Sequence, residues 1–375
     1  MSVNMEPSEC SDSSCDDIVS FAKQVVIDSR IPEACPGFDV PFYQAGLAGY
    51  SDGAMRLIAR RHGCPFCITE ALLDRTLING GKGRRREDPD LLAEETASGE
   101  IEGNKAAGLD DHPIAGQVIG TNPAEMAKGA LILSEMGYDM IDVNLACPVK
   151  KVRRRNRGGH FLCAPQDACD ILSAVREAIP TSLPTTVKMR RGWDDTDLSE
   201  QNFYDVFDHA YEIGFSWATV HARTVEQRYK GPSRWQFLEE LVKARPDRLI
   251  FGSGDIWCAP DIFRMMEQTG VKGVSVARGC IGNPWIFMQA RALMAGKEPK
   301  SPTIQEQRNA LLDHIELCTG LHGEKPASRM MRKFGIQFSK HHHDAESARK
   351  SFIQVKTMQE WKNVIEEYYP PSSNS

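Results

Sequence analysis

The chain has 375 residues, of which 41% are hydrophobic and 26% are charged. This composition is ordinary for a globular protein with a sizeable core, and it excludes a fibrous or wholly disordered chain. The length exceeds the usual single domain of roughly 100–200 residues, which predicts a large domain joined to a smaller one. The formal net charge of −6 neither requires nor excludes a nucleic-acid partner, because phosphate contacts depend on local basic surface.

The composition of the N-terminal segment does not predict a targeting signal. The first 22 residues contain five acidic residues and no Lys or Arg, and no uncharged apolar stretch reaches the length of a membrane span. We therefore expect a cytoplasmic protein without membrane contact. The 11 Cys are odd in number and scattered, which predicts reduced thiols rather than a disulfide framework. Residues 1–38 are rich in Ser, Asp and Glu and predict a disordered acidic tail, and residues 370–375 predict a second tail.

Eight short, β-branched apolar stretches alternate with helical patterns between residues 39 and 298. Eight strand–helix units over about 250 residues predict a closed (β/α)8 TIM barrel, with an open doubly wound sheet as the alternative. The polar, Gly-rich residues 79–112 after the second strand predict a long loop. The strands are predicted at residues 42–48, 66–72, 114–120, 140–146, 185–190, 217–223, 248–254 and 273–278.

Strand patterns stop near residue 302. Three helical stretches follow, at residues 303–323, 327–343 and 345–369. They predict a small all-helical domain over residues 302–369.

Polar residues close most of the predicted strands. Functional side chains of a TIM barrel gather at the carboxyl ends of its strands, so these residues are candidates for chemistry. The turns "GSGDI" and "ARGCIGNP" after the last two strands could direct backbone N–H groups at a phosphate, although their glycines could also simply turn the chain. The candidates are Gln117, Asn144, Cys147, Lys188, Arg190, His221, Arg223, Ser253, Asp255 and Arg278.

Cys147 allows two interpretations. Buried cysteines are usually inert packing. Pro148 ends the strand, however, so the thiol should lie at the rim, where it could act as a nucleophile or as a proton donor. The spacing alone does not choose between these roles.

A basic run follows Cys147. On a barrel, this run would share one rim with Arg190 and Arg223, and a basic mouth suits a long polyanion better than a small molecule. A solvated charged face is the simpler alternative. The residues concerned are Lys150, Lys151, Arg153, Arg154, Arg155 and Arg157.

No metal is expected. Cys64 and Cys67 form a C-x-x-C motif, but no second pair exists, which favours packing. The adjacent His341, His342 and His343 would diverge around a helix axis.

Several motifs occur together in the order found in one family. "NLACPVKKV", "TTVKMRRGWDD", "VHARTVEQRYKG", "GSGDI" and "ARGCIGNPWIF" resemble the tRNA-dihydrouridine synthases, over about residues 40–295. The resemblance implies a TIM barrel that binds FMN, is reduced by NADPH and reduces the carbon 5–carbon 6 double bond of uridines in tRNA. It implies that Cys147 is the catalytic proton donor and that Asn144 orients the base. It places FMN at Gly46, Leu47, Ala48, Gln117, Lys188, His221, Ser253, Gly254, Asp255, Ala277 and Arg278.

The helical domain and the basic run would then bind tRNA, and we expect a monomer. Two alternatives remain open: a flavin-dependent barrel that reduces a free pyrimidine or another activated alkene, and a non-catalytic RNA-binding relative. A basic mouth argues against the first alternative, and the complete set of flavin positions argues against the second.

Overall fold

A closed parallel barrel forms the larger part of the chain. The structure is a computed structural model, and it describes residues 15–79, 111–149, 152 and 154–371. Strands β1 and β9 pair through Phe42 and Val274, and β2 pairs with both β1 and β4, so the sheet closes on itself. The closure confirms the TIM barrel and excludes the doubly wound sheet. The eight predicted strands appear as β1 (Phe42–Gln44), β2 (Cys67–Ile68), β4 (Ile114–Ile119), β5 (Met140–Leu145), β6 (Thr185–Arg190), β7 (Trp217–His221), β8 (Ile250–Ser253) and β9 (Gly273–Val276).

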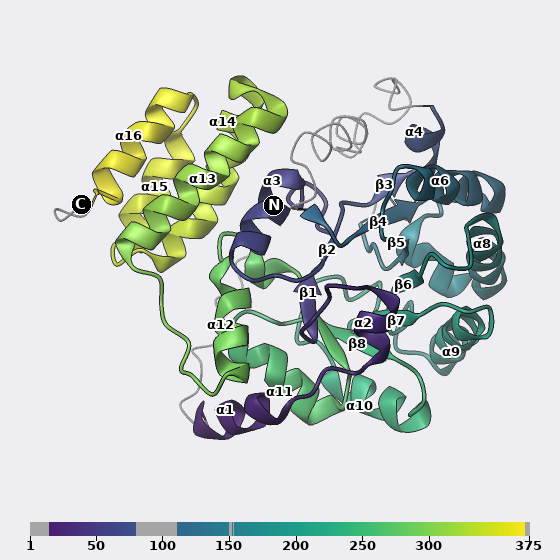
Figure 1. The fold of residues 1–375 in the computed structure, drawn as a ribbon. Coiled ribbons are helices and arrows are strands. Elements are labelled where there is room, and N and C mark those ends of the chain that lie inside the picture. The colour runs from purple at the N-terminus through teal and green to yellow at the C-terminus, as the bar shows by residue number, and fades with distance from the viewer. Residues whose placement is uncertain (1–14, 80–110, 150–151, 153, 372–375) are drawn as a thin grey trace.

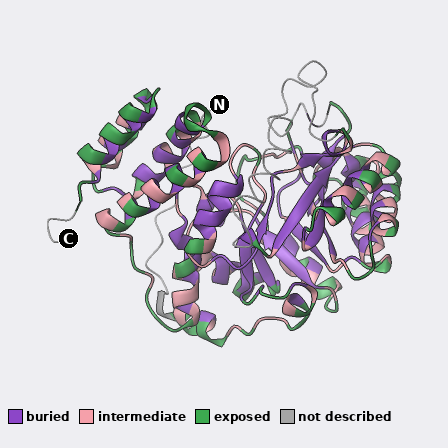
Figure 2. Ribbon diagram, turned by 45° about the horizontal axis from the view of Figure 1, so that its top comes forward, coloured by how far each residue is buried: buried purple, intermediate pink, exposed green. Residues whose placement is uncertain are grey.

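A two-residue strand, β3 (Leu72–Leu73), adds to the end of β4. The predicted loop after the second strand lies largely outside the described residues, since 80–110 are not described. Helices surround the sheet, and the strands between them are buried (Figures 1 and 2). They are α3 (Gly53–Arg61), α4 (Asp74–Ile78), α6 (Pro123–Glu135), α8 (Pro165–Ala178), α9 (Asp197–Glu212), α10 (Trp235–Ala244), α11 (Ala259–Thr269) and α12 (Trp285–Met294), with short 3-10 turns at Gly158–Cys163 and Arg278–Cys280.

Aromatic side chains fill the amino end of the barrel. Phe38 stacks on Phe66 with ring centroids 4.9 Å apart, and Trp217 stacks on Phe251 at 5.0 Å. These rings are fully buried, so the barrel is a packed core rather than a pore. Only the opposite, carboxyl end is left to hold polar groups.

The segment before β1 differs from the predicted loose tail. Residues 15–24 form α1 (Cys15–Gln24), which packs beside α11 and α12, and residues 30–34 form α2 (Arg30–Ala34) (Figure 1). Ile18 and Ala22 are buried one turn apart, and Ile31 and Phe38 join the aromatic core of the barrel. The acidic composition masks this apolar stripe, and the prediction was wrong for residues 15–38. Residues 1–14 lie outside the described residues.

The helical region consists of α13 (Ile304–His322), α14 (Glu324–Phe338), α15 (Ala345–Gln354) and α16 (Met358–Tyr368), with a 3-10 turn at Ser339–His341. The third predicted stretch therefore divides into two helices. Thr357 and Glu360 form a capping box that starts α16, which explains the break. Helix α13 packs against α3, and this joins the helical region to the barrel.

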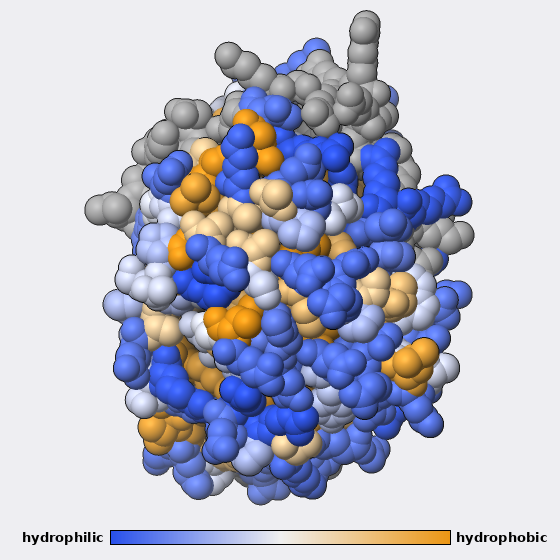
Figure 3. Space-filling view, turned by 90° about the vertical axis from the view of Figure 1, so that its right-hand side faces the viewer, coloured by the Kyte–Doolittle hydropathy of each residue, from blue (hydrophilic) through white to orange (hydrophobic). Residues whose placement is uncertain are grey.

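The outer surface over α6, α8 and α9 is largely hydrophilic, with small separate apolar spots (Figure 3). Among the described helices, none combines the length and the hydropathy that crossing a bilayer requires.

Candidate active site

Side chains from four neighbouring strands meet at the carboxyl end of the barrel. In register, Asn144 on β5 lies opposite Lys188 on β6, and His221 on β7 lies opposite Ser253 on β8. The Lys188 ammonium donates to Ser253 Oγ at 3.4 Å, which spans the mouth from β6 to β8. The structure therefore brings the predicted strand-end residues into one site.

A buried hydrogen-bond chain runs below this mouth. Thr186 donates to one oxygen of Asp142 at 2.6 Å, and Gln117 Nε2 donates to the other at 2.7 Å. Gln117 Oε1 in turn accepts from Asn144 Nδ2 at 2.7 Å. Since Asp142 accepts the Gln117 amide, the orientation of both amide side chains is fixed. The sequence analysis missed Asp142 and Thr186, although a lone Asp in an apolar strand is the signal that could have found them.

Cys147 is held by its backbone. Asn144 Oδ1 accepts the N–H groups of Ala146 and Cys147, each at 3.1 Å. The Cys147 carbonyl accepts from Gly159 N at 3.1 Å. A Cβ on Gly158 would lie 2.9 Å from Cys147 Cβ, so only glycine lets the backbone at residue 158 pass this close to Cys147. The half-buried thiol thus has a defined place at the end of β5.

Burial raises the pKa of the Cys147 thiol above its ordinary value of 9.0, while the Val149 N–H and the Arg190 guanidinium partly oppose this shift. The thiol therefore carries its proton at neutral pH. An acid can use that proton, whereas a resting thiolate nucleophile would need the opposite shift.

Lys188 and His221 are also perturbed. Burial lowers the pKa of Lys188 to about 8, although Asp142 acts against the shift. Burial and the neighbouring cations, Arg190 first among them, lower the pKa of His221 well below 6.5. At neutral pH, Lys188 is mainly charged and His221 is neutral. Perturbed groups gathered in one cleft are typical of a functional site.

Two arginines predicted for an exposed rim are instead inside the protein. Arg190 is 2% exposed and donates to the carbonyls of Ala146 and Thr224 at 3.0 and 2.8 Å. Arg223 is fully buried and donates to Asp255 at 2.7 Å and to the Gly231 carbonyl at 2.6 Å. Both side chains are therefore buried rather than on an open rim, and their predicted contact with RNA stays a prediction. Both guanidiniums instead brace the strand-end loops.

Asp255 performs a related task. Its carboxylate accepts from Arg223 and from the Ser233 N–H at 2.7 Å, and it lies 3.5 Å from Arg278. The Arg278 guanidinium stays partly exposed, 4.6 Å from the ring centroid of Trp257 and 5.2 Å from that of Tyr229. Asp255 therefore orients a cation at the mouth instead of facing an anion itself.

The exposed basic residues lie on a loop anchored at the thiol. Arg154 and Arg155 are exposed, and the loop that carries them leaves at Cys147 and returns at Gly159. Lys150, Lys151 and Arg153 of the same run lie outside the described residues, and Arg157 is buried rather than on the rim. The described part of the run is thus at the edge of the candidate site.

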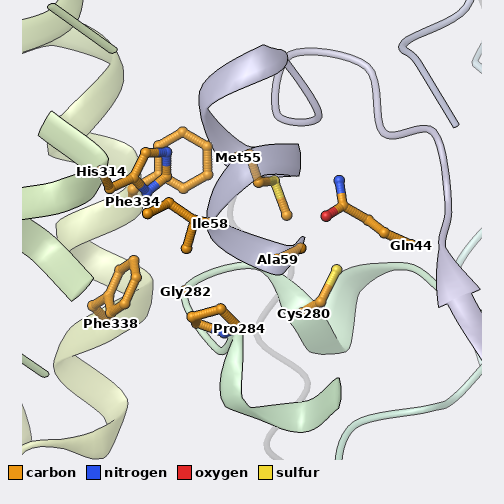
Figure 4. Close-up of a pocket in the computed structure, with 10 residues that line it drawn as sticks. All are labelled: Gln44, Met55, Ile58, Ala59, Cys280, Gly282, Pro284, His314, Phe334 and Phe338. Atoms are coloured by element: carbon orange, nitrogen blue, oxygen red, sulfur yellow. The ribbon is translucent and has the colours of Figure 1, made fainter. Parts of the chain in front are cut away.

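A cavity lies where the barrel meets the helical region. Gln44 at the end of β1 and residues of α3, the turn after β9, α13 and α14 line it, and most are apolar (Figure 4). It marks the junction between the barrel and the helical region, and Asn144, Lys188, His221 and Ser253 are not among its lining residues.

Residues 43–372 match the family model of dihydrouridine synthase (Dus). The chain belongs to the dihydrouridine synthase family. A probable tRNA-dihydrouridine synthase of Rhodobacter capsulatus is 31% identical over 79% of this chain and 85% of its own length. The tRNA-dihydrouridine synthase B of Shewanella oneidensis is 29% identical over 87% of this chain and 94% of its own. These relatives confirm the resemblance that the motifs predict.

Among solved structures, 6-hydroxypseudooxynicotine amine oxidase from Pseudomonas geniculata superposes with a TM-score of 0.52 at 12% identity, covering 80% of this chain and 53% of that one. At this identity the likeness concerns the fold alone.

Dihydrouridine synthases are oxidoreductases, so we tested whether this mouth fits a flavin. Gly254 has φ +111°, and a Cβ there would lie 2.4 Å from Ser233 Oγ and 2.9 Å from His221. A Cβ on Gly279 would lie 2.2 Å from the Ile256 carbonyl. Both turns therefore need glycine. Within the described chain, the buried Ser233 hydroxyl has no hydrogen-bond partner. Asp255 accepts from the Ser233 N–H and also pairs with Arg278, so the hydroxyl and the Arg278 guanidinium flank the same carboxylate. A phosphate group fits this set of donors.

The loop after β1 closes the other side. A Cβ on Gly46 would lie 2.2 Å from the Thr69 carbonyl oxygen and 3.4 Å from Gln117 Oε1, so the loop passes these groups too closely for any other residue. The Leu47 N–H donates to Ser51 at 2.7 Å, which fixes the loop, and Ala48 is exposed. Lys188 and Gln117 can hold the polar edge of a ring between these two sides. The residues present therefore fit a flavin phosphate.

Proposed function

We propose that this protein is a tRNA-dihydrouridine synthase, which binds FMN in the mouth of the barrel and uses NADPH to reduce the carbon 5–carbon 6 double bond of a uridine in tRNA. One observation carries the proposal: the chain places a protonated thiol, that of Cys147, on the same rim as a cradle for a phosphorylated ring. The names of the relatives support tRNA as the substrate.

The chain's residues would share the binding of FMN. Ser253, Gly254, Ala277 and Arg278 surround the phosphate, while Lys188, Gln117 and His221 face the ring, and Gly46, Leu47 and Ala48 close over it. Asp255 acts through Arg278. Bound FMN would supply a hydride to carbon 6 of the uracil, and NADPH would restore the reduced flavin.

Cys147 would donate the proton that carbon 5 needs. The thiol holds that proton at neutral pH because burial disfavours the thiolate. After the transfer, the Val149 N–H and the Arg190 guanidinium stabilise the thiolate, since both favour the charged form. The Asn144 side-chain oxygen accepts the Cys147 backbone N–H and so fixes the position of Cys147. Solvent at the mouth then returns a proton to the sulfur.

The uracil must leave its stack to enter the mouth. Arg154 and Arg155 stand on the loop anchored at Cys147, where they can bind phosphates beside the extruded nucleotide. Lys150, Lys151 and Arg153 would extend the same contact, and residues 302–369 would hold the body of the tRNA.

The test is direct. The full chain, loaded with FMN, is incubated with NADPH and an unmodified tRNA transcript, and dihydrouridine is measured by mass spectrometry of the digested RNA. Free uridine serves as the control substrate. The proposal predicts dihydrouridine in tRNA and little reduction of free uridine. Equal reduction of both would point to a reductase of free pyrimidines.

A further inference from the structure

Three potential metal ligands meet where α3 faces α13, away from the barrel mouth. Asp52 is the N-cap of α3, and Cys318 and His322 lie one turn apart near the end of α13. One donor atom from each residue lies within 4.8 Å of the other two. Asp52 and Cys318 are buried, while the His322 side chain is 15% exposed, which leaves a route to solvent.

The spacing suits one ion. Residues four apart on a helix project on the same side, so Cys318 and His322 both face Asp52. His322 Nε2 lies 2.9 Å from Asp52 Oδ2. Ligands of a tetrahedral zinc ion, bound at about 2.0–2.3 Å, stand about 3.3–3.8 Å apart. A small rotation of the three side chains would reach that arrangement.

The charges also suit a divalent cation. A Cys318 thiolate and the Asp52 carboxylate would neutralise a 2+ ion, and the nearby Lys333 ammonium and Glu70 carboxylate balance each other. Without an ion, burial raises the pKa of the Cys318 thiol, so the sulfur keeps its proton and Lys333 faces Asp52. Metal binding would then release one proton from Cys318.

We propose that Asp52, Cys318 and His322 form a zinc site, with water as the fourth ligand. One thiolate, one imidazole and one carboxylate form a donor set typical of Zn²⁺. The ion would fasten the loop after β1, which ends at Asp52, to the last turn of α13. The site thus joins the barrel to the helical region, and it does not depend on the proposed function.

Cobalt(II) tests the site in the full chain. The purified, chelator-treated protein is titrated with Co²⁺, and the absorption spectrum is followed. We expect a thiolate-to-cobalt charge-transfer band and tetrahedral d–d bands that saturate at one equivalent. Cys318→Ser should lose the charge-transfer band. Asp52→Asn should weaken binding while keeping the helix cap, because Asn caps helices as well as Asp does. Cys35→Ser, another buried thiol, is the matched control and should keep the spectrum.

Stability gives a second readout. Zn²⁺ in excess should raise the melting temperature of the wild-type protein and of Cys35→Ser but not of Cys318→Ser, because a ligand of the folded state stabilises it. Ions held only by surface histidines such as His343 would give no thiolate band. The absence of that band, or its survival in Cys318→Ser, overturns the proposal.

Discussion

Asn144 and Cys147 are joined by a hydrogen bond of 3.1 Å between the Asn144 side-chain oxygen and the Cys147 backbone N–H. The other end of the Asn144 amide donates to Gln117, which donates to Asp142. Thr186 on β6 also donates to Asp142, so the place of the thiol depends on a buried chain that extends across β4, β5 and β6. Removal of one member of this chain should shift the position of the Cys147 sulfur, even where that member does not contact the substrate.

Asn144→Ala should slow the reduction of tRNA by on the order of 100-fold, because a displacement of about 1 Å at a reacting group costs that much. We expect the loss in kcat, with flavin binding retained. Steady-state kinetics and the flavin spectrum check this together. A change confined to KM for tRNA would show instead that Asn144 only binds the substrate.

Lys188 should make flavin binding dependent on pH. Its folded pKa is about 8, so the ammonium that attracts an electron-rich ring is present below this pH and is lost as the pH rises through it. The affinity of the flavin-free protein for FMN should fall over this range. Lys188→Arg, which keeps its charge, should bind FMN without that fall. A wild-type affinity that stays constant from pH 7 to pH 9 would contradict the assignment.

Replacing Arg154 and Arg155 together by Ala should weaken tRNA binding and reduce its dependence on salt. Each lost phosphate contact lowers the slope of log K against log salt by about 0.7–0.9. Binding is measured by filter retention at several salt concentrations. Lys243→Ala, on the outer helix α10 and paired with Glu239, serves as the control and should bind as the wild type does. An unchanged slope in the double variant would mean that this loop does not contact RNA.

His314 should make stability depend on pH. Burial lowers its folded pKa to about 4, against 6.5 when it is unfolded. Its contribution is therefore present above pH 6.5 and is lost as the pH falls from 6.5 through 4, by on the order of 3 kcal/mol at most. Asp52 and Lys333 are the charged groups that act on it. Urea denaturation at pH 7 and pH 5 measures the difference.

His314→Phe is the matched variant. The ring lies 4.3 Å from that of Phe334, and within the described chain neither of its nitrogens has a hydrogen-bond partner. We expect this variant to be as stable as the wild type at pH 7 and to lose less stability at pH 5. An equal loss in both proteins would assign the pH dependence to other groups.

The barrel could be predicted from the sequence because all eight strands are buried and therefore read as continuous apolar runs. Gln117, Lys188 and His221 lie on β4, β6 and β7 of the barrel, as the pattern predicted, and their part in binding a cofactor stays a prediction. The end of a strand can be located from the local sequence pattern, so the positions of these residues could be predicted without knowing any long-range contact.

The roles of charged residues could not be predicted in this way. Arg190 and Arg223 stand at strand ends like the others, but their guanidiniums turn inward. Arg190 bonds the carbonyl of Thr224 after the next strand, and Arg223 bonds that of Gly231 in its own strand-end loop. Asp52 and His322 are 270 residues apart and meet only because α13 packs on α3. The start of α16 was also missed, because one helix was predicted over residues 345–369, although Thr357 and Glu360 have the spacing of a capping box that could have shown it.

The central claim is that Cys147 supplies the proton for reduction of a tRNA uridine. The most direct test is a single turnover, in which Cys147→Ala and the wild type are first reduced by NADPH and then mixed with tRNA while flavin absorbance and dihydrouridine are followed. The account predicts equal flavin reduction by NADPH but a dihydrouridine rate lower by about 10²–10⁴-fold in the variant. Dihydrouridine formed by Cys147→Ala at the wild-type rate would contradict it.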